Sequence, residues 1–243
     1  MILILGKTHD DILYFENIMH NKQEEKVFDK YTVTTGTIYN QNVCLMYDIY
    51  SNYLSSLIVT HLIRTKYVIF VILVGKAKTY FDDLKVGDIV ISNSITLGYV
   101  DFTNETKCKL GQIPSFPQTF LTQTHLAQIF DQSISKVLYR EAIKGNYIST
   151  SRELDNVDQI KYLNSDDFVL GMQNNVVFDT ESGGAAIACN ITDVPLIAIK
   201  VIESKVGEKS SLENYLTVLK SYIDVGKGIS IAISEVGRND FIQ

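Results

Sequence analysis

Four short polar segments, each placed directly after an apolar run, hold the side chains that are suited to chemistry. They are residues 6–11, 75–79, 180–184 and 203–205. Their carboxylates could exchange a proton with a bound molecule or accept hydrogen bonds from its hydroxyl groups, and their lysines could hold an anion. These segments are therefore the first candidates for a binding or catalytic site.

Signatures of other chemistries are absent from the sequence. It contains no phosphate-binding P-loop, dinucleotide fingerprint, metal-ligand spacing or nucleophile elbow. The four histidines are isolated, and the three cysteines, Cys44, Cys108 and Cys189, are far apart and odd in number. We therefore expect no disulfide framework, no metal site and no bound cofactor.

Buried strands and intervening helices are expected to position the four segments. Apolar or β-branched runs predict strands at Ile2–Leu5, Lys30–Thr37, Gln41–Tyr47, Tyr67–Val74, Asp88–Ser92, Tyr147–Ser149, Val176–Phe178 and Leu196–Ile202. Helical spacing predicts helices at Asp10–His20, Leu54–Leu62, His125–Ile143, Val157–Leu163, Gly183–Cys189 and Leu212–Ile223. The stretch Gly98–Phe120 reads as a long loop.

Alternation of doubly buried strands with helices predicts a three-layer α/β fold that contains a parallel or mixed sheet. No linker, repeat or low-complexity tract divides the 243 residues, so we expect a single domain, 1–243. Ligands of such folds bind at the carboxyl ends of the strands, where the four polar segments are expected to lie.

Composition excludes several classes of protein. Hydrophobic residues make up 46% and charged residues 21% of the chain, which is typical of soluble globular proteins. The net charge of −6 argues against a nucleic-acid partner. The longest apolar stretch, Tyr67–Gly75, is much shorter than the roughly 20 residues that cross a bilayer. We expect a cytoplasmic protein without a membrane partner.

A series of segments along the chain also matches a known family. The segments are Ile4–Gly6, Asp83–Ser92, Asp101–Thr103, Gly111–Pro114, Thr180–Ser182, Ala186–Ala188, Val194–Pro195 and Ile202. In this order and spacing the chain resembles the purine nucleoside phosphorylase superfamily, most closely the methylthioadenosine/S-adenosylhomocysteine nucleosidases. The resemblance implies a phosphorylase-like domain with a central mixed, partly barrel-like sheet flanked by helices.

The resemblance implies cleavage of an N-ribosidic bond and suggests roles for two carboxylates. Glu181, which follows Thr180 where the family usually has methionine, matches the glutamate that holds the ribose hydroxyls. Asp11, five residues after Gly6, matches the glutamate that positions the attacking water, with a side chain one methylene shorter. The alternative is that both are acids that cap or stabilise a helix N-terminus. Asp10 is a further candidate for the second role.

The proton donor departs from the family pattern. The aspartate that protonates the purine leaving group aligns with Ser204, and serine cannot deliver a proton at neutral pH as a carboxylic acid can. Glu203 could replace it, but neighbours in a regular strand point to opposite faces, so this requires a bulge or loop at the strand end. The alternative is that Glu203 is a solvated loop residue.

Lysines replace the small residues that the family places around its ligand. Gly75 is kept, but it is followed by Lys76, Ala77 and Lys78. Together with Lys200, these lysines could form an anion site for phosphate or a phosphorylated ligand, or else a solvated rim.

Two functions therefore remain open. One is an N-ribosyl hydrolase or nucleoside phosphorylase that uses Asp11, Glu181 and either Glu203 or Ser204, with Gly6, Gly75, Lys76, Thr180 and Lys200 as further ligand-binding positions. The other is a non-catalytic relative that binds a ligand or a partner. For either, we expect a nucleoside-like or nucleotide-like small molecule as ligand, and the resemblance implies a homodimer.

Overall fold

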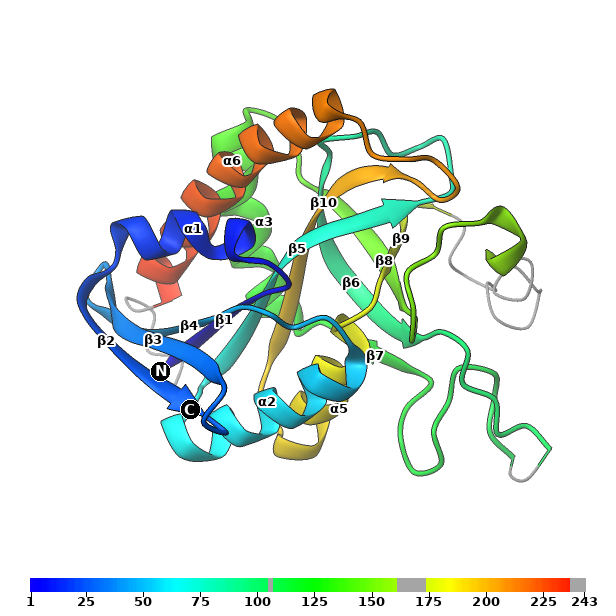
Figure 1. Ribbon diagram of the computed structural model, residues 1–243, viewed down its shortest axis with the longest axis horizontal. Helices are drawn as coiled ribbons and strands as arrows, with labels where there is room; N and C mark the ends of the chain where they lie inside the picture. The colour runs from blue at the N-terminus through cyan, green and yellow to red at the C-terminus, as the bar shows by residue number, and fades with distance from the viewer. Residues whose placement is uncertain (105–106, 161–173, 237–243) are drawn as a thin grey trace.

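The computed structural model describes residues 1–104, 107–160 and 174–236. Every strand in these ranges belongs to one sheet, in the order β10-β6-β8-β9-β5-β1-β4-β3-β2, with β7 paired to β6 (Figure 1). The strands are β1 Ile2–Gly6, β2 His20–Val27, β3 Tyr31–Ile38, β4 Gln41–Met46, β5 Phe70–Thr79, β6 Ile89–Leu97, β7 Thr119–Leu121, β8 Ile143–Ser149, β9 Val176–Asp179 and β10 Leu196–Lys205.

Five of these strands close into a barrel because β10 also pairs with β5. The barrel is mixed: β10 runs parallel to β5 and antiparallel to β6, whereas β8 is parallel to both β6 and β9. From β5 the sheet continues through β1 and β4, which are parallel to it, into the β4-β3-β2 antiparallel extension. The expected partly barrel-like mixed sheet is confirmed.

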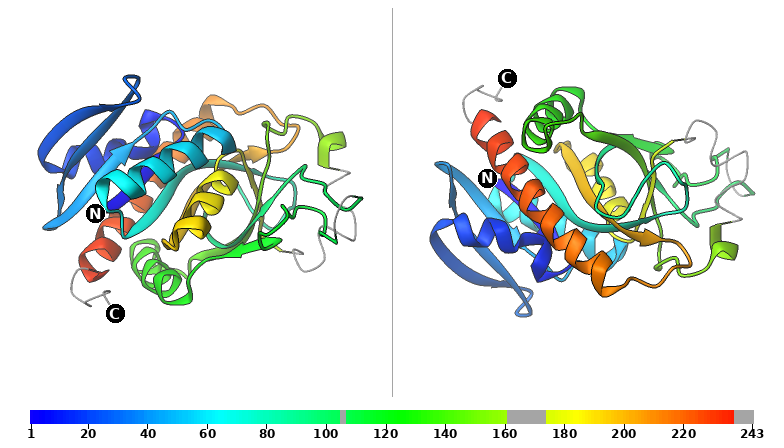
Figure 2. Two further views of the ribbon diagram at one scale, coloured as in Figure 1. Left: turned by 90° about the horizontal axis from the view of Figure 1, so that it is seen from below. Right: turned by 90° about the horizontal axis from the view of Figure 1, so that it is seen from above.

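Helices cover both faces of the sheet, as expected of a three-layer fold. They are α1 His9–Ile18, α2 Asn52–Lys66, α3 Thr124–Leu138, α5 Ser182–Thr192 and α6 Leu212–Val236, with a short 3-10 helix, η1, at Val157–Ile160. Helices α1, α3 and α6 lie on one side, and α2 and α5 lie side by side on the other (Figures 1 and 2). No helix of the described ranges is long and apolar enough to cross a membrane.

Strand β1 shows why the central strands of this sheet are continuous apolar runs. Leu3 and Leu5 belong to the hydrophobic core beneath α2 and α5, whereas Ile2 and Ile4 belong to the core beneath α1, α3 and α6. Side chains alternate between the faces of a strand, so a strand buried on both faces must be apolar at every position.

Several element predictions differ from the structure. Strand β7 begins at Thr119, inside the stretch expected to be a loop, and α6, expected to end at Ile223, continues to Val236. Strand β2 was not predicted, because seven of its eight residues are exposed and its sequence, HNKQEEKV, has no apolar alternation. The helix expected to reach Ile143 ends at Leu138, and Ile143 instead begins β8. At Val157–Leu163, residues to Ile160 form the 3-10 turn η1, and the remainder lies outside the described residues.

Candidate functional site

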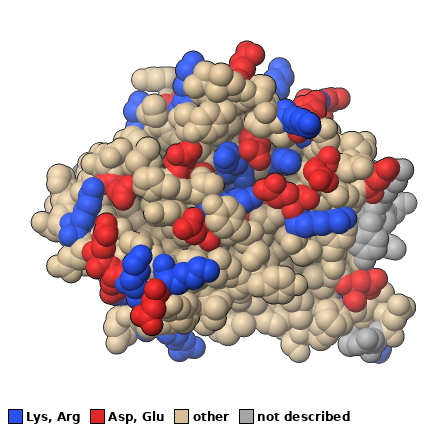
Figure 3. Space-filling view, in the orientation of Figure 1, with Lys and Arg blue, Asp and Glu red and all other residues tan. Residues whose placement is uncertain are grey.

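The parallel strands β1, β5 and β10 end at the same edge of the sheet, and a cleft opens there. It has a volume of about 630 Å³. A much smaller cavity of about 20 Å³, enough for about one water molecule, lies behind it. Five residues border both spaces: Lys7, Lys76, Lys78, Glu153 and Glu203. Figure 3 shows basic and acidic side chains gathered together near the middle of the face that is seen in Figure 1.

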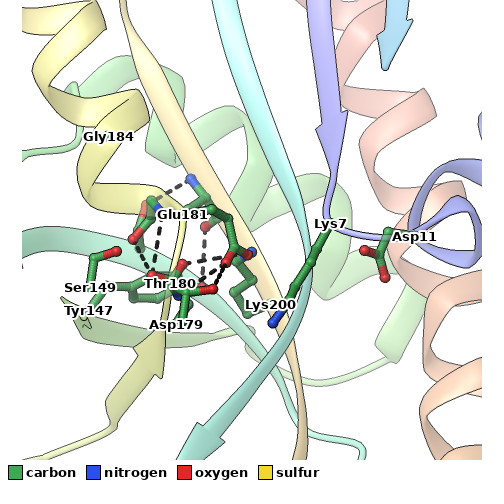
Figure 4. A network of polar contacts seen from close by, with 12 residues as sticks. Lys7, Asp11, Tyr147, Ser149, Asp179, Thr180, Glu181, Gly184 and Lys200 are labelled. Carbon is green, nitrogen blue, oxygen red and sulfur yellow. Dashed lines mark hydrogen bonds and ion pairs between the residues drawn. The ribbon is translucent and has the colours of Figure 1, made fainter. Parts of the chain in front are cut away.

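A buried lysine joins two carboxylates at the inner cavity (Figure 4). The Lys200 ammonium on β10 forms an ion pair with Glu181, and its Nζ lies 3.7 Å from Asp179 Oδ2. All three side chains are almost completely buried. Burial alone would lower the pKa of Lys200, but the Glu181 and Asp179 carboxylates raise it above its ordinary value. Burial, reinforced by the Glu181 charge, raises the pKa of Asp179.

The Glu181 side chain is turned away from the helix that it precedes. Its Oε2 accepts hydrogen bonds from the Thr180 backbone N–H at 3.0 Å and the Thr180 hydroxyl at 2.9 Å. It makes no capping bond to α5, whereas Asp179 Oδ1 accepts from the Ser182 hydroxyl at 2.7 Å and its backbone N–H at 3.3 Å. Glu181 therefore occupies the N-cap position of α5, but the side-chain capping bond comes from Asp179 instead.

Asp11 has a structural role and lies next to Gly75, close to the ends of β1 and β5. Its Oδ2 accepts from the Thr8 backbone N–H at 2.7 Å at the start of α1, and its Oδ1 accepts from the Tyr222 hydroxyl of α6. A Cβ at Gly75 would lie 3.4 Å from Asp11 Oδ2 and 3.0 Å from Lys200 Nζ, so the glycine leaves room for both groups. Burial raises the pKa of Asp11, against the hydrogen bonds from Tyr222 and Thr8.

The strand irregularity that a role for Glu203 requires is present. Along β10, Ile202 pairs with Ala77 of β5 and Ser204 pairs with Lys78, so Glu203 is an extra residue in a bulge. Glu203 is partly exposed and borders both spaces. Burial raises the pKa of its carboxyl group, although Lys76 and Lys78 act in the opposite direction. A carboxyl group whose pKa is raised is better able to donate a proton near neutral pH.

Ser204 and the lysines supply hydrogen-bond donors beside Glu203. Ser204 is buried at the edge of the cleft, and its hydroxyl has no partner among the described residues. Lys78 donates to the Leu154 carbonyl at 3.1 Å, and Lys7 forms an ion pair with Glu153 at 2.5 Å. In the described part of the chain neither Lys76 nor Lys78 has an ion-pair partner within 4 Å.

Comparison with known proteins finds relatives at low sequence identity. No family model matches the sequence. Among curated relatives, the 5'-methylthioadenosine/S-adenosylhomocysteine nucleosidase of Hydrogenovibrio crunogenus is 24% identical over 217 residues, which is 88% of this chain and 90% of the relative. The enzyme of the same name from Bacillus pumilus is 19% identical over 211 residues, 87% of this chain and 88% of the relative.

Several solved structures resemble this chain much more closely in backbone than in sequence. The 5'-methylthioadenosine/S-adenosylhomocysteine nucleosidase from Neisseria meningitidis, in complex with methylthio-immucillin-A, superposes with a TM-score of 0.85 at 17% identity, covering 96% of this chain and 98% of that one. The chain has the nucleosidase fold. The futalosine hydrolase of Helicobacter pylori shares it, with a TM-score of 0.82 at 19% identity over 96% of this chain and 97% of that one.

Within this nucleosidase fold, the inner cavity and the cleft are lined by some of the predicted positions, namely Lys76, Thr180, Glu181, Glu203 and Ser204, but not by Gly6, Asp11, Gly75 or Lys200. Gly6, Asp11 and Gly75 meet at the ends of β1 and β5, and Lys200 links that group to Glu181. Lys200 was expected to share an anion site with Lys76 and Lys78. Its ammonium is instead buried and paired with Glu181, so it is not available to an anion. An anion site at Lys76 and Lys78 stays a prediction.

Four residues at the site were not predicted: Lys7, Glu153, Asp179 and Tyr222. Lys7 lies in the predicted segment 6–11, and Asp179 directly precedes the predicted segment 180–184. Their position at the end of a strand could have pointed to them. Glu153 and Tyr222 come from a loop and from the last helix, and no local pattern connects them with the strand ends. The described residues contain no cluster of histidine, cysteine or acidic side chains that could hold a metal ion.

Proposed function

We propose that this protein hydrolyses the N-ribosidic bond of a purine nucleoside. The observation that carries the proposal is the bulge at Glu203, which brings a carboxyl group with a raised pKa to the same cavity as Glu181. Proton donation to the leaving base requires such a group, and the sequence alone left its presence open. The nucleosidase names of the relatives and structural neighbours support the reaction class.

In the proposed reaction each carboxylate has a separate task. Glu203 donates its proton to a nitrogen of the base as the bond from that base to the ribose C1′ breaks. Asp11 orients a water molecule and accepts a proton from it as the water oxygen bonds to C1′. Glu181 accepts hydrogen bonds from the ribose hydroxyls, and its charge favours the cationic sugar of the transition state. The products are the free base and the free sugar.

The dimensions of the two spaces suggest where a nucleoside binds. The cleft lies in the range of volumes that hold small ligands, whereas the inner cavity holds about one water molecule. For the ribose to reach Glu181, the Lys7 side chain, which extends toward the Glu181 and Lys200 side chains in Figure 4, must swing outward. Its ion pair with Glu153 is partly exposed, so little stability opposes that movement.

The reaction class is tested by incubating the protein with a panel of purine nucleosides and separating free base from nucleoside by chromatography. Base and free ribose should appear in equal amounts, and Glu181→Gln should weaken substrate binding and slow the release. Ribose 1-phosphate formed only in phosphate buffer would instead indicate phosphorolysis. Binding of a nucleoside without release of base would indicate a non-catalytic relative.

The non-catalytic alternative has an observation of its own. Lys200 and Thr180 already occupy both oxygens of Glu181, and the inner cavity is too small for a sugar in this conformation. A protein that only binds a ligand in the outer cleft would need no further space. Isothermal calorimetry with a nucleoside, combined with the chromatographic assay, separates the two functions.

We also propose a homodimer in the cytoplasm. The exposed face of α2, together with α5 and the loop after β6, forms an apolar groove of about 790 Å³ that includes the exposed Tyr53 and Leu57. Exposed apolar patches of this kind commonly mark protein contacts. The three cysteines are free, which suits a reducing compartment. Sedimentation of the protein and of a Leu57→Lys variant tests the dimer.

A further inference from the structure

Lys78 and Ser204 lie next to each other where two strands end at the cleft. They are register partners of the parallel β5–β10 pair, directly after the bulge that carries Glu203. Lys76 lies two residues before Lys78 and thus on the same face of β5. The two lysines border both the cleft and the inner cavity.

Lys76, Lys78 and Ser204 present hydrogen-bond donors, whereas the neighbouring Glu153 carboxylate is paired with Lys7. The Ser204 hydroxyl is completely buried and has no partner in the part of the chain that the structure describes. Lys78 uses one of its three N–H groups on the Leu154 carbonyl, and Lys76 has no ion pair among the described residues. A buried hydroxyl without a partner costs free energy, so its place on the strand next to Lys78 points to a ligand with acceptor atoms.

The two kinds of purine differ at the edge that would face this cluster. Guanine and hypoxanthine present two acceptors, N7 and O6, side by side, whereas adenine presents the N7 acceptor and the donor N6 amino group. An ammonium group can donate to O6, but it repels the amino hydrogens of adenine. Glu203 needs only N7, which both kinds of purine have.

We propose that Lys78 and Ser204, assisted by Lys76, form a subsite that selects a 6-oxopurine as the leaving base. This inference rests on the proposed function for its assignment of Glu203 to the leaving base. With N7 taking the proton from Glu203, O6 accepts from the Lys78 ammonium and the Ser204 hydroxyl. Inosine and guanosine are then better substrates than adenosine.

Equilibrium binding of free bases tests the subsite without requiring catalysis. Calorimetry should show that hypoxanthine binds at least about tenfold more tightly than adenine. Lys78→Met keeps the length of the side chain but removes its donors, and it should abolish this preference, as should Ser204→Ala in part. Lys22→Met, at an exposed lysine of β2 far along the sheet from the cleft, is the matched control and should leave the preference unchanged.

Several results would overturn the subsite. They are equal or tighter binding of adenine, no binding of either base, or a preference that survives Lys78→Met in a variant with an unchanged melting temperature. Inorganic phosphate is a separate arm: if phosphate binds and displaces hypoxanthine with the higher affinity, the lysines serve an anion and the proposal is wrong.

The outcome can be separated from that of the proposed function. If hypoxanthine is preferred but no nucleoside is cleaved, the subsite holds and the proposed hydrolysis fails. If nucleosides are cleaved and adenosine reacts faster than inosine, the hydrolysis holds and the subsite fails.

Discussion

Lys200 and Glu181 form an ion pair that is completely enclosed at the centre of the fold. The lysine comes from the strand that closes the barrel, and the glutamate directly precedes α5. Because Asp179 and Asp11 also act electrostatically on this ammonium, one cation interacts with carboxylates from two separate parts of the chain. The pair therefore links the stability of the fold to the arrangement of the candidate site.

Removal of this cation should destabilise the protein strongly. Lys200→Met leaves buried carboxylates uncompensated, which costs about 3–5 kcal/mol when one partner of a buried pair is lost. Urea denaturation is the measurement. Lys200→Arg keeps the charge and should lose less of the free energy of unfolding. Glu181→Gln added to Lys200→Met should recover part of that free energy. An unchanged stability of Lys200→Met would show that the ion pair is not formed in solution.

Glu203→Gln should stabilise the protein at neutral pH. The folded-state pKa of Glu203 is raised, so its contribution to stability is complete below its unfolded pKa and is lost as the pH rises through the folded value. Glutamine does not ionise and escapes that loss. The melting temperature of Glu203→Gln relative to the native protein should therefore increase from acidic to neutral pH.

The exposed Glu24→Gln of β2 is the control for this measurement and should show no such trend. A melting temperature of Glu203→Gln that falls relative to the native protein as the pH rises would mean that Glu203 is stabilised in its charged form. It would then be a poor proton donor.

Tyr222 should position Asp11 and set the pH at which it works. Its hydroxyl donates to Asp11 and lowers the pKa of that carboxyl group, which burial otherwise raises. Tyr222→Phe removes the bond, so kcat should fall by up to about 10²-fold through misplacement of the carboxylate, with little change in KM. The acidic limb of the pH profile should move to higher pH, because ionised Asp11 is required.

Tyr215→Phe is a matched control for Tyr222→Phe. Tyr215 lies in the same helix and donates to the neighbouring Asp10 at 3.0 Å, but this pair is exposed. The Tyr215→Phe variant should therefore leave both kcat and the pH profile unchanged. An equal effect of the two variants, or a loss of kcat in Tyr222→Phe without movement of the acidic limb, would limit Tyr222 to a structural role.

Cleavage of methylthioadenosine and S-adenosylhomocysteine should be weak or absent. Both nucleosides carry adenine, whose amino group is repelled by the Lys78 ammonium of the proposed subsite, and Ser204 stands where the resembled nucleosidases have their acid. Asp11 is also one methylene shorter than the glutamate it replaces. The double variant Ser204→Asp, Asp11→Glu should raise the rate for these two nucleosides. Ordinary enzyme rates in the unchanged protein would contradict this prediction.

The sequence predicted the layers of the fold better than the details of the site. Doubly buried runs such as Ile2–Leu5 leave no alternative to an internal strand, and the order of these runs indicated the sheet. The bulge at Glu203 was not predictable, because it arises from the mismatch in pairing between β10 and β5 rather than from any local residue pattern. Tyr222 meets Asp11 only through the packing of α6 against α1, across 211 positions of the chain.

The pH dependence of base release by the native protein and by Glu203→Gln tests the central claim most directly. With the preferred purine nucleoside, kcat/KM of the native protein should fall on the alkaline side as Glu203 loses its proton. Glu203→Gln should be at least about 10²-fold slower and should lack that alkaline limb. Base release at an unchanged rate in Glu203→Gln, or no release of base from any nucleoside by the native protein, would contradict the account.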